Sequence, residues 1–240
     1  MWKAELGDFL RFVRRPDFVR RLPRAPMSGV RAECVAGLVP GRLLRWLAVL
    51  WFINLALLGP LSAGVATLTG SENRLLELSL PWPRVVLWAP LIEEMLLRFG
   101  LRRPAQAVWL VPLLLIGLLA VETLAGGLLL AAAAACVLAM LARLRYGWSR
   151  AWLRRYRRAF PVVFHAVTLL FAVLHLGNFR LGGADAWLLP LLVLPQWGTG
   201  LVLGWLRVRT GIGASVALHA LFNAGPMALL WLVQQYGLDA

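Results

Sequence analysis

Residues 104–121 read PAQAVWLVPLLLIGLLAV and residues 123–142 read TLAGGLLLAAAAACVLAMLA, and neither run contains a charged side chain. An α-helix rises about 1.5 Å per residue, so about 20 apolar residues cross the hydrocarbon core of a bilayer. Each run is therefore long enough to form a membrane-spanning helix. The alanines at 131–135 favour close packing of the second helix against its neighbours in lipid.

Apolar runs of similar length lie on both sides of this pair. We predict further spans at residues 46–68, about 84–101, about 159–177, 186–206 and about 213–234. The 240 residues are 60% hydrophobic and 15% charged, and their mean hydropathy is +0.74. A soluble domain needs far more charge to cover its surface. The sequence therefore predicts an all-α, polytopic transmembrane bundle of about seven spans.

The net charge of +14 could indicate a nucleic-acid partner, but the charges follow the predicted membrane topology instead. If the first 45 residues lie inside and the chain changes sides at each span, the inside segments hold 21 of the 25 Lys and Arg residues. The outside segments hold only Arg74, Arg84 and Arg180. This asymmetry is the positive-inside pattern, and it places the N-terminus inside. The excess charge also favours contact with anionic lipid, and we expect no nucleic-acid partner.

The chain divides into a basic cytoplasmic N-terminal segment, residues 1–42, and a transmembrane domain, residues 43–240. In the first segment apolar residues recur at helical spacing between basic residues, as Trp2, Leu6, Phe9, Leu10 and Val13. This pattern predicts a basic amphipathic helix on the inner membrane surface. A frayed basic tail is the alternative, because prolines interrupt the pattern. We also predict an outside loop at 69–83 and a basic inside loop at 143–158.

The span at about 84–101 is unusual because it contains Glu93, Glu94 and Arg98, and each charge costs several kcal/mol at bilayer depth. Glu94 and Arg98 are four residues apart, so on a helix they face each other as an ion pair. Glu93 is rotated by roughly 100° and projects from a neighbouring face. Two carboxylates in different environments allow one to be structural and the other to act as a base. An ion pair that only orders the bundle would leave Glu93 unexplained.

Later spans contain further polar residues at helical spacing. His175 follows Phe171 by four residues in the fifth predicted span. His219 and Asn223 are four residues apart in the last span, so they share one helix face. Both can donate hydrogen bonds toward a developing oxyanion. A histidine in a helix is also commonly a packing residue, and we assign that structural role to His165.

Three motifs thus occur in order on separate apolar helices: Glu93-Glu94-x-x-x-Arg98, Phe171-x-x-x-His175 and His219-x-x-x-Asn223. Together they resemble the CPBP (ABI) intramembrane proteases, a family that includes the type II CAAX prenyl endopeptidases. The block that runs from Leu194 through Arg207–Gly211 to Asn223 also looks like the last conserved block of that family. The resemblance covers residues 85–225 approximately.

The resemblance implies an intramembrane endopeptidase and a role for each of the six polar residues. Glu93 and His175 would activate the attacking water, Glu94 would brace Arg98, and His219 with Asn223 would form the oxyanion hole. No cofactor is implied, and the substrate would be a peptide or a membrane-associated protein. The Arg-, Ala- and Leu-rich composition favours a bacterial source and therefore the cytoplasmic membrane.

Three alternatives stay open at this point. In a zinc-dependent version of the same protease, Glu93, His175 and His219 would bind the metal. The sequence favours the metal-free version, because it has no His-Glu-x-x-His motif and because Asn223 beside His219 suits hydrogen bonding. Intramembrane Glu, His and Arg also occur in proton-coupled or ion-coupled transporters, but we find no internal repeat. A non-catalytic scaffold or immunity protein with the same fold is the third alternative.

Overall fold

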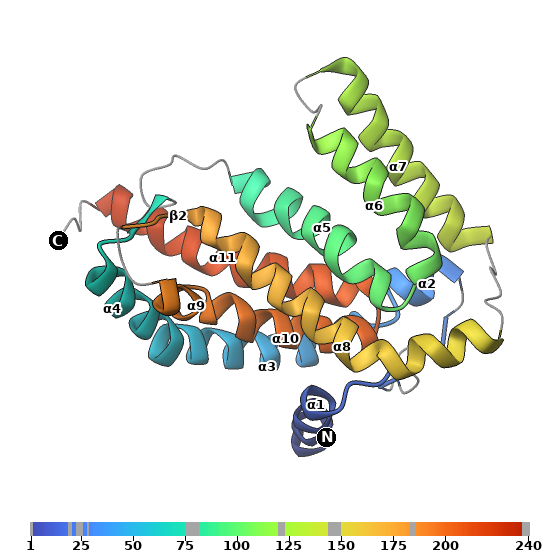
Figure 1. Cartoon of the computed structure of the whole chain (residues 1–240), viewed down its shortest axis with the longest axis horizontal. Coiled ribbons are helices and arrows are strands. Elements are labelled where there is room, and N and C mark those ends of the chain that lie inside the picture. The colour runs from blue at the N-terminus through green and yellow to red at the C-terminus, as the bar shows by residue number, and fades with distance from the viewer. Residues whose placement is uncertain are drawn as a thin grey trace. The chain divides into compact units, whose positions relative to one another are not determined.

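The computed structural model describes residues 2–18, 21–22, 26–27, 29–74, 82–119, 123–143, 150–182 and 186–236. Nearly all of them are helical (Figure 1), so the predicted all-α class is confirmed. Two short strands, β1 (Glu72–Asn73) and β2 (Phe179–Arg180), pair antiparallel. The chain forms two compact units, which we describe separately. Unit 1 comprises Met1–Val39, Leu91–Val167 and Gly204–Ser215, and unit 2 comprises Pro40–Pro90, Thr168–Leu203 and Val216–Ala240.

Unit 1 contains the two apolar runs at residues 104–121 and 123–142, in which the structure has helices α6 (Pro104–Leu119) and α7 (Leu124–Arg143). They lie side by side (Figure 1). Gly117 permits this contact, because a Cβ atom there would lie 2.8 Å from the Leu130 side chain. The other elements of unit 1 are α1 (Trp2–Arg14), α2 (Gly29–Cys34), η4 (Glu94–Arg98), η5 (Phe99–Leu101), the first part of α8 (Arg150–Leu174), the end of α10 (Leu194–Arg209) and the start of α11 (Ile212–Tyr236). Its core is apolar and includes Phe99, Leu110, Leu114 and Ala133.

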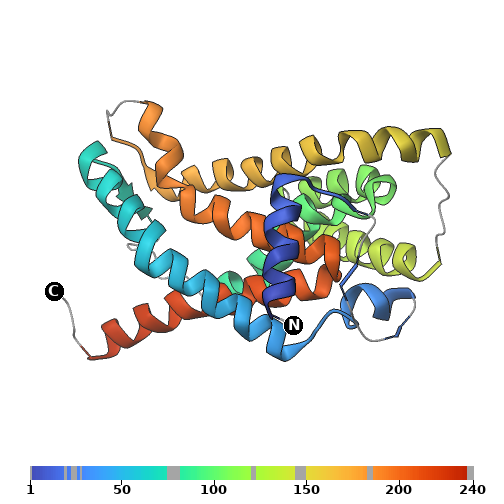
Figure 2. The same cartoon turned by 90° about the horizontal axis from the view of Figure 1, so that it is seen from below.

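Unit 2 contains one long helical run, in which α3 (Pro40–Ile53), the π-helical turn η1 (Asn54–Leu58) and α4 (Gly59–Thr69) follow without a break (Figure 2). The Ser62 hydroxyl donates to the carbonyl of Leu192 at 2.8 Å, which ties α4 to the end of α9. The remaining elements in or entering this unit are η3 (Arg84–Trp88), α5 (Ala89–Glu93), η6 (His175–Asn178), η7 (Ala186–Leu188), α9 (Leu189–Leu192), α10 (Leu194–Arg209) and α11 (Ile212–Tyr236).

Within the part of the chain that the structure describes, three helical runs are long and apolar enough to cross a membrane: Pro40–Thr69, Ala151–Asn178 and Ile212–Leu229. Helix α6 is apolar but shorter. These runs support the predicted membrane protein. The count of seven spans and the inside position of the N-terminus stay predictions.

The predicted basic loop at 143–158 is wrong in its second half, because α8 already begins at Arg150. Arginines have high helix propensity, and the apolar residues between them continue the helical period into the span. The rest of that loop, residues 144–149, and residues 75–81 of the predicted outside loop fall outside the described residues.

The predicted N-terminal helix is present as α1, but the protein itself covers part of its apolar side. Phe12 is buried, and its ring lies 4.9 Å from that of Phe164. The Phe9 ring lies 5.7 Å from Trp205. The sequence pattern alone suggested that the apolar side of α1 faces the membrane surface. Part of that side instead packs against aromatic side chains of unit 1.

Candidate active site

Glu94 and Arg98 delimit a π-helical turn in unit 1. Helix α5 ends at Glu93, and in η4 the N–H of Phe99 bonds to the carbonyl of Glu94, five residues earlier. Such wide turns often mark functional positions in a helix. Glu94 and Arg98 are 0% and 1% exposed, and the Arg98 Nη1 forms an ion pair with the Glu94 Oε1. The ion pair predicted from the four-residue spacing is therefore confirmed.

The second oxygen of Glu94 has its own partner, which the sequence did not indicate. The Ser215 hydroxyl, fully buried near the start of α11, donates to the Glu94 Oε2. The Glu94 carboxylate therefore has a guanidinium on one oxygen and a hydroxyl on the other, and these two partners hold the side chain in place. Ser215 lies four residues before His219 on the same helix. That spacing is the one signal that could have identified it.

Glu93 precedes this turn and lies in a different environment. It is half-buried, whereas Glu94 is completely buried. The two adjacent residues therefore differ in exposure, although the Oε2 atom of Glu93 is itself buried. Glu94 is fixed as part of the turn by its two partners, and Glu93 precedes the turn.

His175 in unit 2 has a defined partner for one of its ring nitrogens. Its Nδ1 lies 2.8 Å from the carbonyl oxygen of Phe171. A carbonyl oxygen only accepts hydrogen bonds, so Nδ1 donates to it, and Nε2 is left for another partner. His175 is half-buried at the start of η6, where α8 ends. This arrangement leaves Nε2 as the nitrogen that could bind a water proton.

The Phe171 ring joins the two predicted histidines of unit 2. Its centroid lies 4.5 Å from that of His175 and 5.8 Å from that of His219. His219 is 3% exposed on α11. His175 and His219, which are 44 positions apart in the sequence, therefore both lie next to one aromatic side chain.

Asn223 lies one turn beyond His219, and its amide binds a backbone carbonyl. The Asn223 Nδ2 donates to the Val85 oxygen at 3.1 Å. Val85 lies in η3, where Ala89 donates to Arg84 in the i→i+5 register. In that register the Val85 carbonyl would pair with the N–H of residue 90, but Pro90 has none. One N–H of the Asn223 amide thus replaces the missing donor, and the second N–H can serve another acceptor.

A second proline, Pro226 in α11, produces a similar contact. Pro226 lacks an N–H, so the carbonyl of Phe222, four residues earlier, has no helical donor. The Trp51 indole donates to this carbonyl at 3.3 Å. A Cβ atom on Gly225 would lie 2.5 Å from the Trp51 ring, so this close contact requires glycine. The rotation of α11 around Asn223 is therefore fixed by α3.

A further buried charged residue, Arg207, supports the Glu94 turn. Arg207 is completely buried, and its Nη1 lies 2.6 Å from the Glu33 Oε2. Burial alone would raise the pKa of Glu33, but Arg207, with Arg21 and Arg103, lowers it to about 2. The sequence predicted neither the pairing of Glu33 with Arg207 nor its pairing with Arg21. An ion pair across 174 positions has no local sequence signal.

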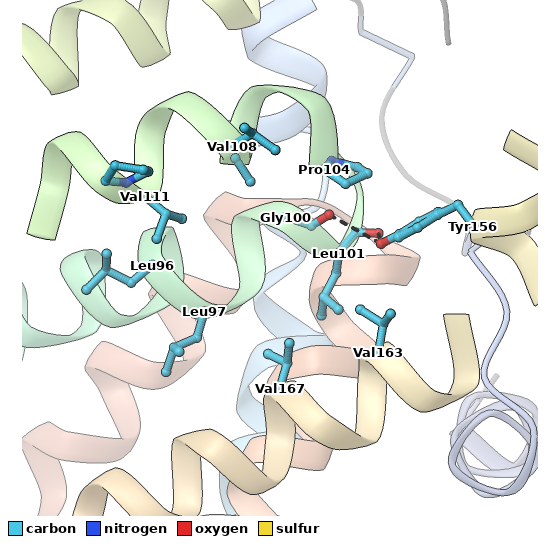
Figure 3. Close-up of a pocket in the computed structure, with 12 residues that line it drawn as sticks. Leu96, Leu97, Gly100, Leu101, Pro104, Val108, Val111, Tyr156, Val163 and Val167 are labelled. Carbon is cyan, nitrogen blue, oxygen red and sulfur yellow. Dashed lines mark hydrogen bonds between the residues drawn. The ribbon is translucent and has the colours of Figure 1, made fainter. Parts of the chain in front are cut away.

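An apolar cavity of about 430 Å³ lies beside the same turn in unit 1 (Figure 3). Leu96 and Leu97 of η4 line one side of it, and Val163 and Val167 of α8 line another. At its edge the Tyr156 hydroxyl bonds to the backbone carbonyls of residues 100 and 101, at 3.3 and 3.1 Å. The cavity could accept an apolar group but offers it no charged partner.

The six predicted residues thus fall into two groups. Unit 1 holds Glu93, Glu94 and Arg98, and unit 2 holds His175, His219 and Asn223. The class of protein that these features define is an all-α integral membrane protein with carboxylate, imidazole and carboxamide groups on apolar helices.

Residues 75–225 match the model of a family described as type II CAAX prenyl endopeptidase Rce1-like. Because this match covers more than half of the chain, the protein belongs to that family. It is therefore an intramembrane protease of the CAAX type in general. No match was found among the curated proteins or the solved structures. All six predicted site residues lie inside the matched region, and Glu33 lies outside it.

Proposed function

We propose that the protein hydrolyses a peptide bond in a peptide or membrane-associated protein, using water activated by Glu93 and His175. The observation that carries this proposal is the difference between the two glutamates. Glu94 is buried and bonded to Arg98 and Ser215, so it is suited to structure. Glu93 is half-buried, so it is suited to accept a proton from water.

The proposed step conserves atoms and protons. Glu93 accepts one proton of the water while the oxygen bonds to the scissile carbonyl carbon, and the carbonyl oxygen becomes an oxyanion. The contact of the His175 Nδ1 with the Phe171 carbonyl leaves Nε2 for another partner, which supports a role in orienting the same water. The intermediate then collapses, the C–N bond breaks, and the proton passes to the leaving amine. In the active protein this requires Glu93 and His175 to reach one water molecule.

His219 and Asn223 are proposed to stabilise the oxyanion. Asn223 has one amide N–H on the Val85 carbonyl, which orients the side chain and leaves its second N–H for the substrate. Preorganised donors of this kind lower the barrier because they need no rearrangement when charge develops.

We propose that the reaction needs no metal. The zinc-dependent alternative makes the opposite prediction in a direct experiment. In the metal-free mechanism a strong zinc chelator leaves the purified enzyme active, and elemental analysis finds substoichiometric zinc. Inactivation by the chelator with recovery on added zinc would establish the metallopeptidase instead.

The finer topology is also a proposal. We propose about seven spans, an inside N-terminal segment at residues 1–42, a transmembrane domain at 43–240 and the cytoplasmic membrane of a bacterium. The charge asymmetry supports this arrangement. Single cysteines placed at Arg74 and Arg154 and labelled with a membrane-impermeant reagent in intact cells test it, with labelling expected only at Arg74.

The central test is the Glu93→Gln variant, with Glu72→Gln as its matched control. Glu72 is 68% exposed and faces Arg180 across the β1–β2 pair. The proteins are purified and assayed on fluorogenic CAAX peptides with and without a prenyl group. Glu93→Gln should lose on the order of 10²–10⁴ in rate, and the control should keep wild-type turnover. Wild-type turnover by Glu93→Gln would refute the proposed function.

A further inference from the structure

The segment before the family match is attached to the end of α10 by two buried arginines. Arg209 donates to the Asp8 carboxylate at 2.8 Å and to the Asp17 carboxylate at 2.8 Å. Arg207, two residues earlier, binds Glu33 at 2.6 Å. These acids all come from residues that the family match does not cover. The N-terminal segment is thus an integral part of unit 1.

The two arginines differ in what else they bind. Besides Glu33, Arg207 donates from Nε to the carbonyl of Arg98 at 3.2 Å and from Nη2 to that of Phe99 at 3.1 Å. These carbonyls lie where the π-helical turn η4 ends and η5 begins, and the Phe99 carbonyl also accepts from the backbone N–H groups of Arg102 and Arg103. A planar guanidinium can serve a carboxylate and two carbonyls at once. Arg207 therefore connects Glu33 directly to the turn that carries Glu94.

Backbone packing holds Glu33 in this position. Gly211 has a φ of 156°, and a Cβ atom there would lie 2.4 Å from the Glu33 carbonyl oxygen. A Cβ atom on Gly213 would lie 1.8 Å from the Cys34 carbonyl oxygen. Glycine at both positions allows the end of α2 to lie directly against the junction of α10 and α11. The approach is too close for any other residue at these positions.

We propose that Glu33 is a positioning residue for the reaction: through Arg207 it fixes the turn that orders Glu93, Glu94 and Arg98. The N-terminal segment then completes the active centre of the family domain instead of serving only as a membrane-surface helix. This inference rests on the proposed function of Glu93.

The charge of Glu33 is constant under working conditions. Its pKa of about 2 keeps it ionised at any pH near neutrality. The pair with Arg207 is therefore a permanent part of the turn. It does not act as a switch that opens when the pH changes within the physiological range.

The test compares Glu33→Gln with Asp17→Asn. Each change removes one acidic side chain of the N-terminal segment. Glu33 binds Arg207 and Asp17 binds Arg209, and of these two arginines it is Arg207 that contacts the turn. Small displacements of catalytic groups can cost about 10²-fold in rate, so Glu33→Gln should lower kcat by about 10- to 100-fold with KM nearly unchanged. Asp17→Asn should leave kcat within about twofold, since a partly exposed ion pair contributes little.

A second pair of variants covers the case in which Glu33→Gln does not fold. Arg207→Lys keeps the positive charge for Glu33 but cannot bind both carbonyls, so kcat should fall while the protein remains folded. Glu33→Asp should restore part of the activity lost in Glu33→Gln. Equal kcat in Glu33→Gln and Asp17→Asn, an effect on KM alone, or full activity in Arg207→Lys would each overturn the proposal.

The same assay separates this inference from the proposed function. Glu93→Gln is measured in parallel on the same fluorogenic peptides. If Glu93→Gln is active, the proposed function fails whatever Glu33 does. If Glu93→Gln is inactive and Glu33→Gln has wild-type kcat, only the positioning role fails.

Discussion

The segment from Arg84 to Leu101 contains two π-helical turns that are held in opposite ways. In η4 the turn is fixed by charge, through the Glu94–Arg98 ion pair and the Ser215 hydroxyl. Among the described residues η3 has no such pair, and the Asn223 amide binds a carbonyl that Pro90 deprives of a donor. A buried ion pair can be strong only if both charges stay paired, whereas a carbonyl needs only one neutral donor. The two turns should therefore respond differently to mutation.

The largest effect is expected for the charged turn. Glu94→Ala or Arg98→Ala leaves one charge buried without its partner, which costs roughly 3–5 kcal/mol. The double variant should be less damaged than the sum of the single variants, because neither charge then remains. Thermal unfolding of the four proteins in detergent measures this coupling. Additive losses would show that the pair does not stabilise the turn.

Asn223→Ala should mainly affect turnover. Loss of one oxyanion-hole donor costs roughly 10²–10³ in kcat, with little change in KM. The lost bond to Val85 should lower the free energy of unfolding by only about 1 kcal/mol. Steady-state kinetics and unfolding on the same samples give both numbers. A stability loss as large as that of Arg98→Ala would remove the contrast between the two turns.

Ser215→Ala tests the second partner of Glu94. It leaves one oxygen of a buried carboxylate without its hydroxyl donor, which costs about 1–3 kcal/mol. The loss should be smaller than in Arg98→Ala, because the ion pair remains. Ser215→Thr keeps the hydroxyl and serves as the control in the same unfolding experiment. Equal stability of Ser215→Ala and wild type would mean that the hydroxyl does not bind Glu94 in the folded protein.

The smallest and most specific effect is expected from Pro90→Ala. The new N–H can pair with the Val85 carbonyl, so the Asn223 amide is no longer needed there. In the Asn223→Ala background, Pro90→Ala should restore about 1 kcal/mol of stability without restoring turnover. This double variant separates the structural bond of Asn223 from its proposed catalytic one. Recovery of activity together with stability would assign Asn223 a purely structural role.

Local spacing explains which parts of the site could be predicted. Glu94 and Arg98 are four residues apart, and so are His219 and Asn223, and both spacings place side chains on one helix face whatever surrounds the helix. The hydrogen bond of the His175 Nδ1 is equally local, because its acceptor is the carbonyl of Phe171 one turn earlier. Hydropathy likewise identified the apolar helical stretches, although it missed that α8 extends back to Arg150 and that the predicted span at 186–206 is divided at Val193 between α9 and α10.

The all-α membrane class, the family motifs and the ion pair within the turn could therefore be predicted, because each depends on residues within one helix. The contacts of Ser215 with Glu94, of Arg207 with Glu33 and of Asn223 with Val85 depend on the tertiary fold. These partners are separated by 121, 174 and 138 positions. Each depends on which helices pack together, and the pairing of distant helices leaves no periodic pattern in the sequence.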